Sequence, residues 1–174
     1  NNLIIVGAMA NNFLVFENFK VGKSLVEKNT YNIIEQIYKK AREYNCEIII
    51  PKDCVVGTTF EGDGKNKNLD KIQDNDIILD IGSDTIIDIK NKIEQSNTVL
   101  WNGPAGYFEN ENFLNGTRSI AETISKNTLD RSLISVLGGG DTIAAINKSK
   151  NKLSFSHLST AGGAFLEYLE GKDL

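Results

Sequence analysis

Short apolar runs along the chain alternate with longer stretches in which apolar residues recur every three or four positions. A short apolar run between polar segments predicts a strand, and the longer period predicts an amphipathic helix. The predicted strands lie at residues 3–6, 47–51, 76–81, 98–101, 133–137 and, more weakly, 153–156. Helical patterns lie between most of them, which is typical of a parallel sheet.

Two segments show the helical period most clearly. One face of TYNIIEQIYKKAREY is formed by Ile34, Ile37, Tyr38 and Ala41. Thr30 is the predicted N-cap of this helix. One face of TRSIAETISKN is formed by Thr117, Ile120, Ala121 and Ile124. Because the strands are apolar on both faces, helices are expected on both sides of the sheet. We therefore predict the α/β class: a three-layer α/β/α, Rossmann-like domain with a mainly parallel sheet.

Length and charge narrow the class of protein. The 174 residues suffice for one domain with a core, and 40% of them are hydrophobic, so we expect a single domain over residues 1–174. Acidic residues outnumber basic ones by 23 to 19 without any run of Lys or Arg, so we expect no nucleic-acid partner. No apolar run approaches the ~20 residues of a membrane span, and we expect no membrane association. The polar segment 61–76 is interpreted as a surface excursion rather than an interdomain linker.

The cysteines and the chain ends add two further expectations. Cys46 and Cys54 form no CxxC pair, and the chain has one histidine, so a zinc site is not predicted. Reduced, structural thiols fit a cytoplasmic location.

The first residue is not methionine and stands two residues before an apolar run. We interpret the chain as a fragment of a longer protein, incomplete at both ends.

Glycines follow three of the predicted strands. In open α/β sheets, ligands bind outside the carboxyl ends of the strands, so these positions are candidate binding residues. The first is LIIVGAMANNF, where Gly7 and Ala8 lead from a strand into a helix. Small residues here would let the backbone approach a flat ligand, or would let the helix pack closely, and both interpretations stay open.

The second place is a glycine triplet, Gly138 to Gly140, before a helix that opens with Asp141 and Thr142. Glycines free the backbone N–H groups to face a ligand, and a helix N-terminus favours an anion, so we predict a phosphate-binding turn. No lysine follows the glycines, so the turn is not a Walker A loop. Asp141 has two interpretations: a carboxylate that caps the helix, or a ligand of Mg²⁺ held between it and the phosphates.

The third place, FSHLSTAGGAFLEYLEG, has Ser159 and Thr160 as cap candidates before Gly162 and Gly163. It offers a second helix N-terminus for an anion. His157 lies beside serines, but no GxSxG elbow accompanies it. We interpret it as a histidine packed at a strand end rather than part of a nucleophile pair.

The motifs WNGPAGYFE, GGGDTIAA and SHLSTAGGAFLEYLEGK occur in this order on one α/β chain. Together they closely resemble the carboxyl-terminal, nucleotide-binding domain of the phosphoglycerate kinase family, and IIVGAMANNFL, VGKSLVE and LDIGSDTI extend the resemblance to nearly the whole chain. The resemblance implies ADP or ATP as substrate and Mg²⁺ as cofactor. It implies the glycolytic phosphoryl transfer between 1,3-bisphosphoglycerate and ADP that gives 3-phosphoglycerate and ATP. Such chemistry depends on positioning and charge stabilisation rather than on a side-chain nucleophile.

The resemblance also implies roles for individual residues. The turn beside the nucleotide would be formed by Asn102, Gly103 and Pro104. Glu109 would bond the ribose hydroxyls, and Trp101 would be a strand-end packing residue. The adenine slot would be lined by Gly7, Ala8 and Gly82. The phosphate side would be formed by Gly138, Gly139, Gly140, Asp141 and Thr142, with Asp141 on the Mg²⁺. The implied catalytic positions are Gly140, Gly162 and Gly163, and the last two match the helix start that receives the transferring phosphoryl group.

Two residues depart from the family pattern. Ala8 and Ala161 stand where the family usually has glycine, which is tolerable at negative φ, although Ala8 could narrow the adenine slot. The resemblance implies that a phosphoglycerate-binding domain and the lysines for the nucleotide phosphates precede residue 1. We therefore expect 3-phosphoglycerate or 1,3-bisphosphoglycerate to bind through that amino-terminal domain, a monomeric phosphotransferase at full length, and an inactive isolated chain.

Two other functions were weighed against this one. A nicotinamide-dependent dehydrogenase is disfavoured because no GxGxxG motif follows the first strand. A non-catalytic nucleotide-binding module is the alternative that stays open, since the isolated chain would behave in much the same way.

Overall fold

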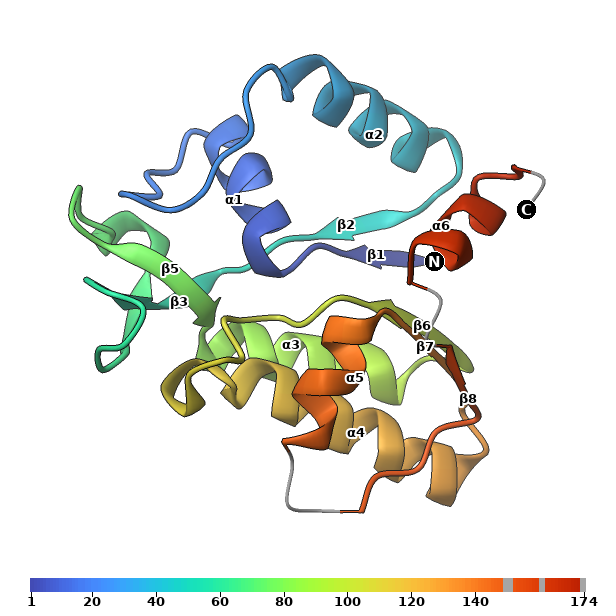
Figure 1. Cartoon of the computed structure of the whole chain (residues 1–174). Helices are drawn as coiled ribbons and strands as arrows, with labels where there is room; N and C mark the ends of the chain where they lie inside the picture. The colour runs from blue at the N-terminus through green and yellow to red at the C-terminus, as the bar shows by residue number, and fades with distance from the viewer. Residues whose placement is uncertain (149–151, 160–161, 173–174) are drawn as a thin grey trace. The chain divides into compact units, whose positions relative to one another are not determined.

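The structure is a computed structural model of the chain, and it describes residues 1–148, 152–159 and 162–172 (Figure 1). The chain divides into two compact units. Unit 1 comprises Asn1–Ile89 and Ala105–Gly116, and unit 2 comprises Lys90–Pro104 and the described part of Thr117–Leu174. Each unit contains parallel strands with helices between them in the sequence, which confirms the predicted α/β class.

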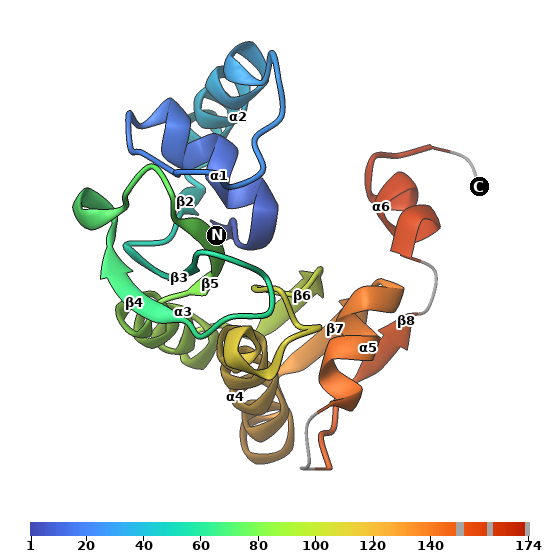
Figure 2. The same cartoon turned by 60° about the vertical axis from the view of Figure 1, so that its left-hand side comes forward.

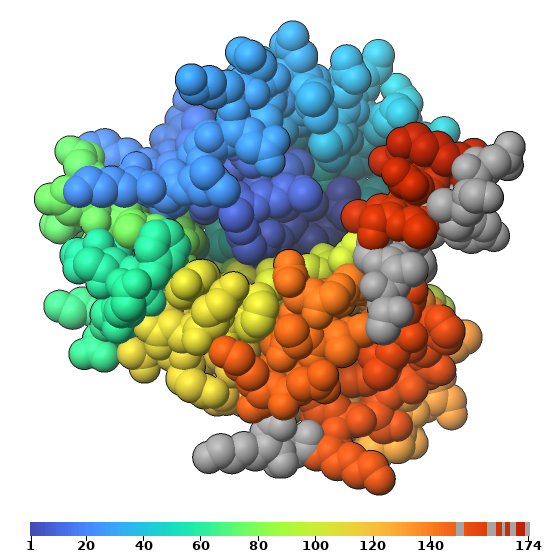
Figure 3. Space-filling view, viewed as in Figure 1, coloured from blue at the N-terminus to red at the C-terminus, as the bar shows by residue number. Residues whose placement is uncertain are grey.

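Unit 1 begins with a parallel pair of strands, β1 (Asn2–Ile4) and β2 (Glu47–Ile49). Two helices, α1 (Gly7–Phe16) and α2 (Tyr31–Glu43), connect these strands. Their shared core consists of Ile5, Ala10, Phe13 and Ile34, with Ile37 and Tyr38 partly buried against it. The predicted face of α2 is therefore confirmed, while the opposite face of this helix lies at the surface (Figure 3).

The predicted Thr30 cap is wrong in one respect. Thr30 occupies the N-cap position of α2, but its side chain makes no capping hydrogen bond. Its φ of −83° and ψ of −13° are helical, whereas a capping side chain normally requires extended backbone at this position.

A second sheet in unit 1 is antiparallel, although one mainly parallel sheet was predicted. Its central strand β3 (Asp53–Gly57) pairs with β4 (Lys65–Asn68) and β5 (Ile77–Ile81) on either side (Figure 2). The strands β3 and β4 were not predicted from the hydrophobic pattern. Pro51, which has no N–H to donate, separates β2 from β3 within one apolar stretch, and the KNKN sequence of β4 lacks strand-forming residues. The segment 61–76 is mostly exposed, as expected, but it also carries β4 and the 3₁₀ helix η1 (Leu69–Lys71).

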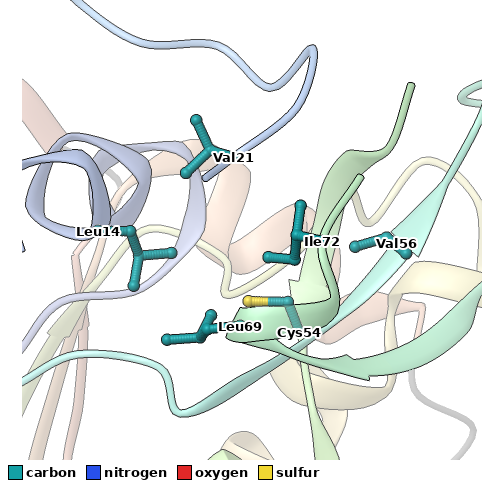
Figure 4. Close-up of a cluster of buried hydrophobic side chains, with 6 residues drawn as sticks. All are labelled: Leu14, Val21, Cys54, Val56, Leu69 and Ile72. Carbon is teal, nitrogen blue, oxygen red and sulfur yellow. The ribbon is translucent and has the colours of Figure 1, made fainter. Parts of the chain in front are cut away.

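The core beneath this sheet joins α1 to β3. It consists of Leu14, Val21, Cys54, Val56, Leu69 and Ile72 (Figure 4). Cys54 is fully buried here, and burial raises the pKa of its thiol to about 12, so the thiol stays protonated and apolar in character. Both Cys46 and Cys54 are free thiols; Cys54 is a core residue, whereas Cys46 is only half-buried.

Unit 2 is built on a parallel sheet in the order β6 (Thr98–Asn102), β7 (Ile134–Gly138) and β8 (His157–Ser159). The helices α3 (Ser83–Glu94) and α4 (Asn115–Arg131) both begin in unit 1, and the 3₁₀ helix η2 (Glu111–Phe113) precedes α4. The helix α5 (Gly140–Asn147) follows β7, and α6 (Gly162–Leu169) follows β8. The predicted apolar face of α4 is confirmed, because all four of its residues are buried: Thr117, Ile120, Ala121 and Ile124.

The weak strand predicted at 153–156 is wrong by several residues. Pairing of β8 begins only at His157, opposite Val136. Before it, the backbone N–H groups of Ser154 and Ser156 donate to side-chain hydroxyls, at 2.8 Å to Ser125 Oγ and 2.9 Å to Ser135 Oγ. Serine side chains thus take the place of strand partners, which a hydrophobicity pattern does not reveal.

Candidate functional site

The carboxyl ends of the three parallel strands in unit 2 pair with one another. Asn102 at the end of β6 pairs with Gly138 at the end of β7, and Gly138 pairs with Ser159 at the end of β8. The segments after these strands therefore start side by side. Such an edge is where open α/β sheets bind their ligands.

A hydrogen bond joins the turn after β6 to the helix after β7. The backbone N–H of Gly103 donates to Thr142 Oγ1 at 2.7 Å, and Thr142 is fully buried. On the other side of the same residue, the indole N–H of Trp101 donates to the carbonyl oxygen of Gly103 at 2.7 Å. Trp101 is 7% exposed, so it is a packing residue at the strand end, as predicted, and it also holds the turn that follows it.

The glycine triplet forms the passage from β7 into α5. Gly138 ends the strand, Gly139 is the N-cap residue and Gly140 is the first residue of the helix. Gly139 has a φ of +94°, and a Cβ atom built on it would lie 2.5 Å from Asn102 Oδ1. The positive φ favours glycine at this position, and a Cβ atom would also displace the end of the Asn102 side chain.

Asp141 lies in the first turn of α5, one residue after Gly140, and it is exposed. The N-cap is Gly139, which has no side chain to make a capping hydrogen bond, and Asp141 lies inside the helix. The capping interpretation of Asp141 is therefore not supported, although a carboxylate in the first turn still interacts favourably with the helix dipole.

The remaining predicted residues of unit 2 lie at or near the ends of strands β6 and β8. Pro104 follows Gly103, and Gly162 and Gly163 are the first two residues of α6. Thr160 and Ala161 lie outside the described residues. His157 is exposed within β8, so its predicted packing is wrong. The hydroxyl of the neighbouring Ser156 accepts a hydrogen bond from Ser135 N and donates to Leu133 O.

The other predicted site residues belong to unit 1. Gly7 opens α1 with a φ of +65°, which favours glycine, and the exposed Ala8 is not among the residues with positive φ. Glu109 is exposed in the loop before η2. That loop is held by Tyr107 N, which donates to Leu79 O at 2.6 Å, and by Asn110 Nδ2, which donates to Phe60 O at 2.9 Å.

Gly82 has a packing requirement of its own. A Cβ atom on Gly82 would lie 2.2 Å from the carboxylate of Asp53, which is fully buried. Asp53 accepts hydrogen bonds from Thr85 N, from Thr85 Oγ1 and from Asp84 N at 2.7–3.1 Å, and so it caps α3 from the neighbouring strand β3. This contact accounts for Gly82 without reference to any ligand.

The sequence analysis missed Asp53 and a second buried carboxylate, Asp80. Asp80 on β5 accepts a hydrogen bond from Gly116 N in the first turn of α4 at 2.7 Å and another from Ile81 N at 2.8 Å. Burial raises the pKa of Asp80 to about 7, and the two backbone donors only partly oppose this. The available signal was an aspartate inside an apolar strand run, LDI, where a charged residue needs a specific partner.

Among the described residues, no cluster of three or more His, Cys, Asp or Glu side chains could hold a metal ion. The described part of the chain also has no helix that is long and apolar enough to cross a membrane. Within unit 2, the structure brings together five of the predicted site residues: Asn102, Gly103, Gly138, Gly139 and Thr142.

Comparison with known proteins gives a consistent result over the whole chain. The family model described as phosphoglycerate kinase matches residues 1–172. The chain is 44% identical to a phosphoglycerate kinase of Xanthobacter autotrophicus and 43% identical to one of Bartonella tribocorum, over 99% and 100% of its own length. It spans 44% of the length of each of these relatives.

Solved structures give the same match. The phosphoglycerate kinase of Coxiella burnetii superposes with a TM-score of 0.90 at 39% identity, covering 98% of this chain and 44% of that structure. The enzyme of Pyrococcus horikoshii superposes with a TM-score of 0.73 at 28% identity, covering 98% of this chain and 42% of that structure. The chain belongs to the phosphoglycerate kinase family.

Proposed function

We propose that this chain is the nucleotide-binding, carboxyl-terminal part of a phosphoglycerate kinase, and that it binds ADP or ATP with Mg²⁺. The observation that carries the proposal is the hydrogen bond from Gly103 N to Thr142 Oγ1. This bond links the WNGP turn to the GGGDT turn at the carboxyl edge of a parallel sheet, which is the usual place for a nucleotide in such folds.

The phosphates of the nucleotide would lie against the start of α5. Gly138, Gly139 and Gly140 carry no side chains, and the first N–H groups of a helix have no partner within the helix. These donors and the helix dipole favour a phosphate group at this point. No side-chain nucleophile is needed, because phosphoryl transfer depends on alignment and charge neutralisation.

Asp141 would hold the Mg²⁺. Its carboxylate is exposed in the first turn of α5, beside the proposed phosphate position. One carboxylate fits this ion, because Mg²⁺ commonly takes its other ligands from phosphate oxygens and water. When bound, Mg²⁺ would neutralise the charge that develops on the phosphates during transfer.

The roles proposed for the rest of the site are supported by the resemblance of individual motifs to the family. Asn102, Gly103 and Pro104 would form the turn beside the nucleotide, and Glu109 would accept hydrogen bonds from the ribose hydroxyls. The adenine slot would involve Gly7, Ala8 and Gly82, although the contact of Gly82 with Asp53 explains that glycine equally well. The transferring phosphoryl group would be received at Gly140, Gly162 and Gly163.

The full reaction would move a phosphoryl group between 1,3-bisphosphoglycerate and ADP, giving 3-phosphoglycerate and ATP. We propose that the phosphoglycerate is held by residues outside this chain, in a monomeric, cytoplasmic enzyme of glycolysis. The chain spans 44% of the length of its curated relatives, which is compatible with this division of labour.

Calorimetric titration of the full-length protein with ADP and Mg²⁺ tests the proposal. We expect binding in the wild-type protein and a loss of ~1–3 kcal/mol of binding free energy in Glu109→Ala, the range for removing a charged hydrogen-bond partner. Glu111→Ala is the matched control, because it removes another exposed glutamate two residues away. A wild-type protein that binds no ADP would refute the proposal, and equal affinities in the two variants would remove Glu109 from the site.

A further inference from the structure

Thr142 is fully buried, although it lies in the first turn of the helix that would receive the phosphates. A side chain that has no solvent-exposed surface cannot contact a ligand that binds from the solvent. Its hydroxyl oxygen instead accepts the hydrogen bond from Gly103 N at 2.7 Å. The role of this side chain must therefore be exerted through the turn that it holds.

We propose that Thr142 is a positioning residue: its hydroxyl fixes the Asn102–Pro104 turn in the conformation that receives the nucleotide. This inference rests on the proposed function, and it adds a specific role for one side chain. The direct contacts would be made by the turn and by the backbone of α5.

The conformation of Gly103 shows why the turn needs to be held. Gly103 has a φ of +96°, and no atom lies within 4 Å of the place where its Cβ would be. Packing therefore does not confine this residue, and glycine is free to adopt other conformations. The hydrogen bonds that fix it are the one to Thr142 Oγ1 and the one from Trp101 Nε1 to its carbonyl oxygen.

The hydrogen bond between Gly103 and Thr142 also holds the WNGP turn beside the GGGDT turn. Asn102 Oδ1 lies so close to Gly139 that a Cβ atom there would be 2.5 Å from it, and the Cβ of such a residue would be 3.3 Å from Thr142 Oγ1. The Asn102 side chain, Gly139 and the Thr142 hydroxyl thus form one compact cluster. Asn102 itself is held by its pairing with Gly138, so a turn released from Thr142 would let Gly103 and Pro104 move relative to the start of α5.

The experiment compares Thr142→Val with Thr142→Ser in the full-length protein. Valine nearly preserves the shape of threonine but removes the hydroxyl, whereas serine keeps the hydroxyl. We expect valine to weaken the calorimetric affinity for ADP with Mg²⁺ by about tenfold, since the partly buried Gly103 N–H loses its acceptor, and serine to restore most of it. Thr123→Val is the control, because Thr123 is also a buried threonine of unit 2, with a hydroxyl that donates to Ser119 O.

A second readout reports on the turn itself and needs no ligand. The indole N–H of Trp101, identified in a ¹H–¹⁵N spectrum by its loss in Trp101→Phe, donates to Gly103. We expect its resonance to move in Thr142→Val, to return in Thr142→Ser and to stay unchanged in Thr123→Val. The measurements are made at a temperature at which thermal unfolding shows every variant to be folded.

The outcomes separate the two proposals. If the wild-type protein binds no ADP, the proposed function fails, while the indole resonance still tests whether Thr142 holds the turn. An indole resonance that is unchanged in Thr142→Val, or a Thr142→Val protein with wild-type ADP affinity, would overturn the positioning role. Failure of serine to restore the affinity would also overturn it, because the methyl group rather than the hydroxyl would then be responsible.

Discussion

Asp53 and Asp80 are buried carboxylates on paired strands, yet their pKa values move in opposite directions. Burial acts to raise the pKa of Asp53, but hydrogen bonds from Thr85, Asn66 and Asp84 outweigh it and lower the pKa. At Asp80, burial prevails over the hydrogen bonds from Gly116 N and Ile81 N and raises the pKa to about 7. The balance between burial and hydrogen bonding at each carboxylate therefore decides which protonation state the fold prefers.

Asp80 should make stability depend on pH in the range between its two pKa values. In the unfolded chain its pKa is about 3.9, so between about pH 4 and pH 7 the folded protein binds a proton that the unfolded chain has lost. The free energy of unfolding should fall as the pH rises through this range, by at most about 1.4 kcal/mol per pH unit. Denaturant titrations across the range measure this slope.

Asp80→Asn is the variant that isolates the effect. Asparagine cannot ionise, so we expect the slope between pH 4 and pH 7 to be smaller than in the wild type, on the order of one proton less. The lowered pKa of Asp53 acts in a different range, because its contribution is lost only as the pH falls below the ordinary carboxyl pKa of about 3.9. An unchanged slope in Asp80→Asn would contradict the assignment to Asp80.

Asp141 offers a test of the metal site at a single side chain. If its carboxylate holds Mg²⁺, Asp141→Asn should reduce the magnesium dependence of ADP binding and change thermal stability by less than ~1 kcal/mol, the range of a surface charge near a helix dipole. Asp84→Asn is the matched control, because Asp84 is also an exposed aspartate in the first turn of a helix, α3. Equal magnesium dependence in both variants would remove Asp141 from the metal site.

At the level of secondary structure, the first turns of helices α3 and α4 are each capped by an aspartate from another element. Asp53 from β3 meets the first turn of α3, and Asp80 from β5 meets that of α4. Ordinary N-caps come from the residue just before the helix. Here the caps also fasten each helix to the antiparallel sheet, so that local helix stability and sheet packing depend on the same side chains.

Removing the Asp53 carboxylate should therefore cost more than removing an ordinary cap. Asp53→Ala would leave the N–H groups of Thr85 and Asp84 and the amide of Asn66 without their acceptor, and we expect a loss of ~2–3 kcal/mol in unfolding free energy. Asp74→Ala is the control, because Asp74 is highly exposed and its ion pair with Lys20 should contribute less than ~1 kcal/mol. Equal losses in chemical denaturation would refute the capping role.

Elements that are determined by their own residue pattern could be predicted from the sequence. Elements that depend on contacts with residues far away in the sequence could not. The apolar face of α4 and the strands β5, β6 and β7 follow from residue period, and these predictions are confirmed within one or two residues. The strand β4 forms only because β3 offers it a partner, and KNKN carries no signal of that. The glycine turn after β7 was evident from its residues, whereas the link between Gly103 and Thr142 joins positions 39 residues apart and arises only in the folded chain.

For the molecule as a whole, we expect the 174-residue chain alone to be a poor catalyst even if it binds ADP. Holding the acceptor in line with the nucleotide can be worth roughly 7–11 kcal/mol of the barrier, and the acceptor is proposed to bind elsewhere. The GGGDT turn brings no lysine of its own, and losing one preorganised donor typically costs ~10²–10³-fold in rate. Lobe closure, which excludes water in hinge-bending kinases, would also be lacking.

A coupled assay with 3-phosphoglycerate and ATP checks this expectation. The chain is compared with the same protein at the full length of its relatives, and ADP binding by each is measured as the control for folding. Activity of the 174-residue chain within about tenfold of the longer protein would mean that the acceptor site has been assigned to the wrong part of the enzyme.

The hydrogen bonds of Gly103 and Gly116 have a consequence for how the protein ages. Each glycine follows an asparagine, at Asn102 and Asn115. Asn-Gly pairs are chemically labile, because the backbone nitrogen of the unhindered glycine can attack the asparagine side-chain amide. This attack expels ammonia, and hydrolysis of the resulting ring leaves aspartate. In the folded chain both nitrogens are engaged at 2.7 Å, one with Thr142 Oγ1 and the other with Asp80 Oδ2. Spontaneous deamidation at these two sites should therefore occur in molecules that have unfolded. The extent of deamidation in stored protein should then increase with the time that the protein has spent unfolded.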